Sequence, residues 1–430
     1  MQRPSLPFFL AGALGLVACV SSPAMHAAES GDRLALKSEV ERREKAASLS
    51  NREAAALAFA VADREVRVAT GPDALERVRD AWSCAHELDG ALAERMRTHD
   101  EAGAQAALAR VDGRGLEVDE LRQYLDDTSP RWRAAGTRAL VRLEDHAARM
   151  RALLDPDPGV RRQAARACRD ATDPNDLPPL AEAARVDPEP MVRTEAVRAI
   201  AALSPLPAEG AANALRDLWA AGDDGLREDI ALAWAAPAVW GAGGREALRI
   251  IVASDHGPGA VEAAAAVLRH RDVTGDVAVA ALAQLVRAIE QGSPATRQQA
   301  IAQAPLDRRE VLAAVKAATE GEDTEVQVAA LARLAEEKLP GAVEKLEALA
   351  QPGSPLSLRA RFALASVGDR RVQSWLEQDL TSERPFDRLS AAMALVSLHA
   401  SARAAPLLAD LDPRVRVRAA CTLLMAARSR

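Results

Sequence analysis

One string of residues recurs along most of the chain and constrains its fold more than any other feature. DPDPGVRRQAARAC occupies residues 155–168, DPEPMVRTEAVRAI occupies 187–200, and DLDPRVRVRAACTLL occupies 410–424. Ten copies follow one another at spacings of 28 to 36 residues. Their aligned positions are Trp132, Val160, Val192, Leu226, Ala260, Thr296, Val326, Leu358, Asp387 and Val415. A period of this length suits two short helices and two turns, so it predicts a repeat architecture.

Each copy carries the signals that begin an amphipathic helix. Asp157 stands three residues before Val160, where its side chain can accept the free backbone N–H groups of a helix N-terminus. Proline stands two residues before the aligned position in seven of the ten copies, where its fixed φ suits the first helical turn. Apolar residues follow on one helical face, as in Val192, Ala196, Ala199 and Ile200.

A second helical run precedes this helix in most copies, for example LPPLAEAARV at 177–186 and REVLAAVKAAT at 309–319. One such helix pair cannot bury its apolar face alone, whereas stacked neighbours can. We therefore expect an all-α fold, a right-handed α-solenoid of about ten helix pairs over residues 128–430. Because each repeat of a solenoid touches only its neighbours, we expect an open array.

Residues 34–127 are also helical in pattern, but they are less regular. VRDAW at 78–82 and DEAGAQAALARV at 100–111 lie about one and two repeat lengths before Trp132. We interpret this region as divergent helical pairs that cap the array. A separate helical domain is the alternative.

The string LRARFALASVGD at 358–369 resembles the HEAT repeat, in the short variety found in phycobilin lyases. The resemblance covers roughly 300 residues of the chain and is strong in aggregate, although single copies are weak. It implies a helix-pair solenoid. In that family, a turn aspartate and a helix arginine commonly form a ladder between neighbouring repeats.

An arginine column follows the aligned position in eight of the ten copies, and it is interrupted near Glu262 and Gln327. The resemblance implies that these arginines pair with turn acids. A basic stripe that contacts a partner is the alternative. The column consists of Arg133, Arg161, Arg193, Arg227, Arg297, Arg359, Arg388 and Arg416.

The first residues are typical of an exported protein. A short positive start, MQR, precedes the apolar stretch LPFFLAGALGLVA, which is too short to span a bilayer. The sequence Leu16-Val17-Ala18-Cys19 resembles the bacterial lipobox. The resemblance implies that residues 1–18 are a signal peptide and that Cys19 becomes lipid-modified. Residues 19–33 are then expected to form a flexible tether.

The lipobox also bears on location. Residue 20 is Val rather than Asp, so the known inner-membrane retention signal is absent. The resemblance therefore implies an outer-membrane lipoprotein of the cell envelope that faces the periplasm. The alternative is an ordinary signal cleaved near Ala27, which would give a soluble periplasmic or secreted protein.

Three cysteines remain after Cys19: Cys84, Cys168 and Cys421. Cys168 occupies a repeat position that apolar residues fill elsewhere, so we expect a buried free thiol. Cys168 and Cys421 are eight repeats apart, and a disulfide spans no more than about 7 Å between Cα atoms. We therefore expect no bridge between these two residues within one chain.

Charge and motifs disfavour several classes of function. The formal charge is −7, so no global basic field attracts nucleic acid. No HExxH, GxSxG, phosphate-binding loop or Cys/His metal spacing occurs, and we expect no catalytic residue, cofactor or metal. His86-Glu87 is the single His-Glu pair, too few for the two-iron site of deoxyhypusine hydroxylases, which also use such repeats.

The C-terminal helix carries an apolar run that is wider than one buried stripe: Leu423, Leu424 and Met425. No acidic residue follows Asp412, so the neighbouring arginines are unopposed in sequence. An apolar end with a basic rim is typical of an interaction site. We expect this end to dock a partner or a second copy of the chain. Coverage by the other helix of the same repeat is the alternative.

Together these features predict a non-catalytic scaffold of the bacterial envelope that is lipid-anchored and binds another protein on a curved surface. Contact with the membrane is expected through the lipid alone. One alternative is an enzyme, or a metal- or small-molecule-binding accessory factor, with a site in the N-terminal region around His86. Another is an envelope structural protein that self-assembles, with homo-oligomers formed through the C-terminal repeat.

Overall fold

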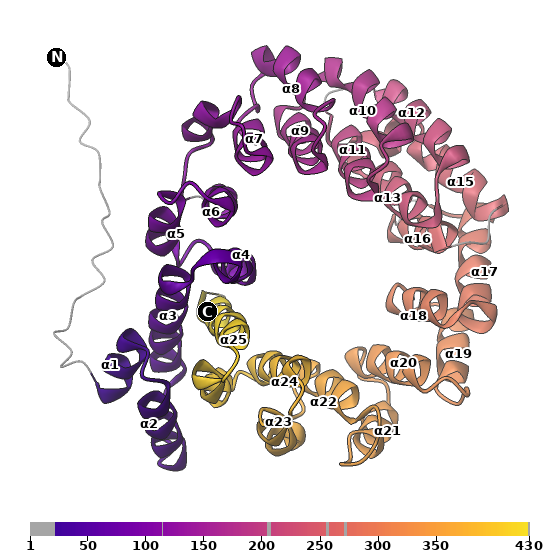
Figure 1. The fold of residues 1–430 in the computed structure, drawn as a ribbon. Coiled ribbons are helices and arrows are strands. Elements are labelled where there is room, and N and C mark those ends of the chain that lie inside the picture. The colour runs from indigo at the N-terminus through magenta and orange to yellow at the C-terminus, as the bar shows by residue number, and fades with distance from the viewer. Residues whose placement is uncertain (1–21, 114, 204–207, 255–257, 271–272, 429–430) are drawn as a thin grey trace, which may run out of the picture.

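The computed structural model describes residues 22–113, 115–203, 208–254, 258–270 and 273–428. Every regular element within these ranges is a helix. The helices follow one another around a ring in two layers, one facing inward and one facing outward (Figure 1). The chain is thus an all-α solenoid, as the repeat predicts.

Ten helix pairs build the array between residues 118 and 428, and each aligned position lies in the second helix of its pair. The second helices form the inner layer (Figure 1). They are α7 (Pro130–Thr137), α9 (Pro158–Ala171), α11 (Pro190–Ala202), α13 (Asp224–Ala235), α16 (Pro258–Arg269), α18 (Pro294–Ala302), α20 (Thr324–Glu336), α22 (Ser357–Ser366), α24 (Pro385–Ser397) and α25 (Pro413–Arg428).

The first helices of the pairs are mostly α-helical and form the outer layer (Figure 1). They are α8 (His146–Ala152), α10 (Leu177–Val186), α12 (Ala208–Ala221), α15 (Arg245–Ser254), α17 (Asp276–Gln291), α19 (Arg309–Ala318), α21 (Ala342–Leu349) and α23 (Gln373–Asp379). In the first and last pairs this place is taken by the 3₁₀ segments η2 (Val118–Tyr124) and η7 (Ser401–Ala409). Shorter elements are η3 (Leu143–Asp145), η4 (Pro174–Asp176), α14 (Pro237–Val239), η5 (Trp240–Gly244) and η6 (Arg370–Val372).

The inner helices begin and pack as their residue types require. The side chain of Asp157 accepts the backbone N–H groups of Gly159 and Val160, which caps α9, and Pro158 occupies its first turn. Alanines form much of the buried face, so neighbouring inner helices can approach closely. No helix among the described residues has both the length and the hydrophobicity that a membrane span requires.

The N-terminal region continues the array. Helices α3 (Asn51–Val68) and α5 (Asp89–Met96) lie in the outer layer, while α4 (Gly71–Asp80) and α6 (Glu101–Asp112) lie in the inner layer (Figure 1). Helix α6 packs on α5 and α4 and also on α7, so these pairs join the repeats without a break. The region is therefore a set of divergent helical pairs rather than a detached domain.

Two further helices precede these pairs, α1 (Pro23–Ser30) and α2 (Arg33–Lys45). Ala24, Ala27 and Ala28 of α1 are buried, and α1 packs on α2 and α3. The expected flexible tether over residues 19–33 is therefore wrong for most of its length. Small residues at positions 24, 27 and 28 allow a short helix to seat closely on its neighbours.

The last repeat of the array packs against the N-terminal region, so the chain closes into a ring and the expectation of an open solenoid is wrong. Helix α25 packs along α3 and also against α4 and η1 (Trp82–Cys84). Cys84 and Cys421 form a disulfide across this junction, with Cα atoms 5.2 Å apart. We call the contact of α25 and η7 with α2, α3, α4 and η1 the closure seam. Cys168 is a buried free thiol, as its repeat position predicts.

Charged groups from both ends meet in the closure seam. The buried carboxylate of Glu65 on α3 accepts from Arg416 on α25 at 2.6 Å and from Arg77 on α4 at 2.5 Å. Asp80, at the end of α4, pairs with Arg414 at 2.8 Å and with Arg418 at 3.1 Å. No acidic residue follows Arg414, Arg416 or Arg418 in the sequence. In the folded chain, Asp80 and Glu65, more than 330 residues earlier, form ion pairs with them.

Closure also changes the role of the C-terminal apolar run. Leu423 and Leu424 are buried within the chain, and only Met425 is exposed. The expected apolar docking end is therefore wrong for the two leucines. The N-terminal helices cover α25 on the side where a further repeat would otherwise stack. Because these leucines are buried within the chain, they offer no exposed apolar surface for an oligomer contact through this end.

Candidate functional site

The arginine column forms a ladder that ties each repeat to the next. The guanidinium of Arg161 donates to both carboxylate oxygens of Asp187, at 2.7 and 2.9 Å, and to the backbone carbonyls of Asp155 and Pro156. Arg133 and Arg388 pair in the same way with an acid of the next repeat, and Arg193 donates from one nitrogen to a single carboxylate oxygen of such an acid. These acids are Asp155, Asp223 and Asp410. The ladder is therefore part of the frame.

Arg416 makes the last rung of the ladder. It donates to the carbonyls of Asp410 and Leu411 in its own turn, as Arg161 does in its turn, but its carboxylate partner is Glu65 of α3. No eleventh repeat follows α25 within the described chain. Glu65 therefore takes the place that the turn acid of a following repeat would fill.

Three positions of the predicted column differ. Arg227 and Arg297 donate from Nε to backbone carbonyls of their own repeats. Arg359 is exposed and pairs with Glu325, whereas Arg361 is buried and donates to Asp379 and to the carbonyl of Ala350. The prediction of Arg359 as a ladder residue is therefore wrong. The repeat is shifted by two residues, with the fully buried Ala360, not Leu358, in the aligned position.

The acids of the ladder are held in their ionised form. Burial alone would raise the pKa of Asp187, but hydrogen bonds from Arg161 and from the backbone of Glu189 hold that pKa below its usual range. The same balance, with Arg133 and the backbone of Asp157, lowers the pKa of Asp155. Because their pKa values are lowered, these carboxylates stay ionised near neutral pH and serve as structural anions.

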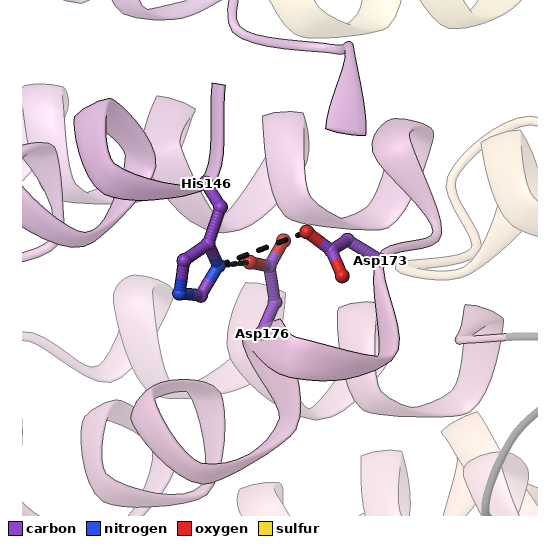
Figure 2. Close-up of side chains that lie close together, drawn as sticks. All are labelled: His146, Asp173 and Asp176. Atoms are coloured by element: carbon purple, nitrogen blue, oxygen red, sulfur yellow. Dashed lines mark hydrogen bonds and ion pairs between the residues drawn. The ribbon is translucent and has the colours of Figure 1, made fainter. Parts of the chain in front are cut away.

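One cluster of side chains has the composition of a metal site. His146 at the start of α8 lies beside Asp173 and Asp176 in the turn before α10, and the possible ligand atoms lie within 4.8 Å of one another (Figure 2). Nδ1 of His146 is 2.6 Å from Oδ1 of Asp176. Both aspartates are buried. The sequence does not predict this cluster, because His146 and Asp176 are 30 residues apart and only the packing of the folded chain brings them together.

Arg149 explains why this cluster is better suited to an internal ion network than to a metal. Its fully buried guanidinium donates to Asp176 at 2.7 Å and to Asp173 at 2.8 Å. Asn175 donates to the remaining oxygen of Asp173 from its backbone and its side chain. A divalent cation here would lie against a fixed positive charge, and it would have to displace these donors.

The thiol of Cys168 lies near the same network. Burial raises its pKa far above the usual range of a cysteine, and the carboxylate of Asp176 acts in the same direction. A thiol that stays protonated is a poor nucleophile and a poor metal ligand. Cys168 therefore packs as a small apolar side chain.

An open cavity of about 820 Å³ lies on the inner layer, across α6, α7, α9 and α11. We call it the inner pocket. Trp82, Leu108 and Pro158 contribute apolar surface to its wall. Helix α9 contributes three arginines to the wall, one or two helical turns apart: Arg162, Arg166 and Arg169. The spacing of these arginines is visible in the string RQAARACR at 162–169, but their common surface depends on the stacking of α6 and α7 beside α9.

The remaining predicted site residues are not brought together. The Nδ1 atom of His86 contacts the carbonyl of Gly113, and His86 is not part of the metal-type cluster at His146. Cys19 lies outside the described residues.

Comparison with known proteins supports the repeat assignment. A family model described as HEAT repeats matches residues 147–235, which span α8 to α13 and include α9 and α11 of the inner pocket. This segment therefore carries HEAT repeats. No curated protein matches the chain.

Among solved structures, the crystal structure of Kap121p is similar to 87% of this chain, with 13% identity and a TM-score of 0.33. A crystal structure of a Kap121p triple mutant gives the same identity and TM-score over 90% of this chain. In each case the match covers 46% of the Kap121p chain, so this chain spans just under half of its length. The likeness is distant and carries no functional information.

The ion network at Arg149 gives a stability prediction. Replacing Arg149 with Met leaves Asp173 and Asp176 buried without their cation, and the loss of one partner from a buried pair costs about 3–5 kcal/mol. Urea unfolding should show this loss for R149M. R151M on the same helix is the control, because Arg151 is exposed. Equal losses for the two variants would contradict the structural role of the network.

Proposed function

We propose that this HEAT-repeat chain is an exported, lipid-anchored scaffold that binds another protein on the inner surface of its ring and catalyses no reaction. The observation that carries the proposal is a set of large apolar side chains exposed on inner helices. The location rests on separate observations at the N-terminus and the closure seam.

Phe386 of α24 has 76% of its surface exposed, and Met393 on the same helix and Phe362 on α22 are also exposed. In the register of the repeat, these residues occupy the positions that Gly159, Arg166 and Arg162 fill in the inner pocket. They therefore point toward the inner surface. Exposed aromatic and methionine side chains are typical of protein interaction surfaces, which supports a protein partner.

Two features support export and the lipobox. Disulfides form and persist in oxidising compartments, so the Cys84–Cys421 bond favours the envelope over the cytosol. The alternative signal cleavage near Ala27 would cut through α1, whose buried alanines pack on α2 and α3. Cleavage before Cys19 leaves α1 intact, which favours the lipoprotein over the soluble form.

The lipid anchor can be tested by replacing Cys19. C19A removes the acceptor of the lipid, so the mature chain should appear in the soluble fraction of the envelope, or the precursor should remain uncleaved. Cell fractionation and mass spectrometry of the N-terminus measure both outcomes. Unchanged processing and membrane association of C19A would refute the anchor.

Partner binding on the inner surface can be tested with a photo-crosslinking amino acid. At position 386 it should form covalent adducts with another protein in the native envelope. Position 279 on the outer helix α17 is the control, because Val279 is similarly exposed. Gel electrophoresis of the crosslinked chains separates the adducts. The absence of adducts from position 386, or the same adducts from both positions, would contradict binding on the inner surface.

A further inference from the structure

The arginines of the inner pocket differ from the ladder arginines in how firmly they are paired. Arg161 is held at 2.7 and 2.9 Å by both oxygens of Asp187. Its neighbour Arg162 reaches Glu195 only at 3.3 Å. Hydrogen bonds between ionised groups are usually about 2.7–2.9 Å long. Of these two adjacent arginines, Arg161 is therefore held by short hydrogen bonds within the ladder, whereas Arg162 makes only a long contact with its acid.

The other two pocket arginines follow Arg162 in this respect. Arg166 contacts Asp112 at 3.3 Å, and Arg169 contacts Glu195 at 3.5 Å and Asp170 at 3.3 Å. A guanidinium carries five N–H donors, so each arginine keeps donors available for a ligand. Their spacing along α9 places the first and the last about 10 Å apart along the helix.

The charges at the surface of the inner pocket are uneven. The side chain of Arg162 is 39% exposed, whereas that of its partner Glu195 is 5% exposed. Asp112 and its partner Arg166 are covered to a similar degree, with side chains 21% and 19% exposed. Glu101 is an exposed acid at the rim, where it pairs with Arg131. In the Arg162–Glu195 pair the cation is therefore the more exposed partner, and Asp157, which also lines the pocket, accepts the backbone N–H groups of Gly159 and Val160.

The wall of the pocket also contains polar atoms without partners. Gln163 lines the cavity, is 8% exposed, and its Oε1 has no hydrogen-bond partner. Nε of Arg162, the preceding residue, has none either. Buried polar groups are normally paired, and an unpaired buried group destabilises the structure that contains it. An occupant that lets these side chains reorient would remove this destabilisation.

We propose that the inner pocket binds an extended acidic peptide segment of a partner protein. Acidic side chains of the segment pair with Arg162, Arg166 and Arg169, and its apolar side chains pack on Trp82, Leu108 and Pro158. Side chains at positions i and i+2 of an extended peptide are about 6.6 Å apart, so two or three acids in alternation match the arginine row. The backbone N–H groups of the peptide supply donors for an acceptor such as Gln163.

The observations favour a peptide over other anions. A nucleic acid carries a continuous row of phosphates, and the chain as a whole has a charge of −7 with Glu101 at the rim of the pocket. A small carboxylate would use the arginines, but it would leave the apolar wall and the amide of Gln163 without partners. A peptide satisfies the cationic, amide and apolar parts of the wall together.

This inference rests on the proposed binding of a protein to the inner surface and names the chemistry of that partner. The probe is a short fluorescein-labelled peptide of alternating leucine and glutamate, and its matched control carries glutamine in place of glutamate. Fluorescence anisotropy measures the binding of each to the oxidised full-length protein. We expect the acidic peptide to bind at least roughly tenfold more tightly than the glutamine peptide, because each ionic hydrogen bond is worth more than a neutral one.

Variants of the protein then locate the site. R162Q/R169Q should weaken binding of the acidic peptide by roughly tenfold or more. R151Q/R185Q is the control, because it makes the same change in net charge at exposed arginines on the outer helices α8 and α10. Binding to this control should match that of the unaltered protein. Circular dichroism confirms that both variants are folded.

Four outcomes would overturn the inference: equal binding of the acidic and glutamine peptides, equal weakening by both variants, full competition by succinate, or tighter binding of a labelled oligonucleotide. Succinate competition would indicate a small-carboxylate site, and oligonucleotide binding would indicate a polyanion site. If position 386 still forms protein adducts while the acidic peptide does not bind, the scaffold function stands and the acidic-peptide inference fails. The loss of both results would refute the two proposals together.

Discussion

The buried carboxylate of Glu65 holds the two ends of the molecule together. It accepts from Arg416, the last arginine of the ladder, and from Arg77 of the neighbouring helix α4. An ion pair in such a covered position depends on good geometry and on the presence of both partners. In every other complete rung the acid belongs to the next repeat of the array. At the last rung it belongs to α3, so the frame continues across the closure seam by the same interaction that builds the rest.

Closure has consequences for the whole structure. An open solenoid needs polar caps at both ends, because its terminal repeats have no neighbours. Here α25 and the N-terminal helices cover one another, and the Cys84–Cys421 disulfide joins them covalently. The inner helices therefore face one another around the ring (Figure 1). The inner pocket and the exposed Phe386 both lie on this inner layer, and this common surface is the basis for placing the partner there.

The sequence predicts the repeats well and the closure poorly, for physical reasons. Capping acids, prolines and alanine spacing are local signals, so the ten inner helices follow from them. Closure depends on small rotations between repeats that add up over the ring, and no local signal reports their sum. In the sequence alone, the run of Leu423 and Leu424 therefore resembles an exposed end, and nothing local predicts the pairing of Cys84 with Cys421. The sequence does not reveal the two-residue shift at Arg361, because Arg359 and Arg361 occupy nearly equivalent places in the string LRARFALA.

Closure is the central claim of this account, and disulfide mapping of the native protein tests it most directly. The purified protein is alkylated without reduction, digested and analysed by mass spectrometry. The closed ring predicts a linked pair of peptides that contains Cys84 and Cys421, with Cys168 recovered as a free thiol once the chain is unfolded. Free thiols at Cys84 and Cys421, or a bond from either residue to Cys168, would contradict the closed ring.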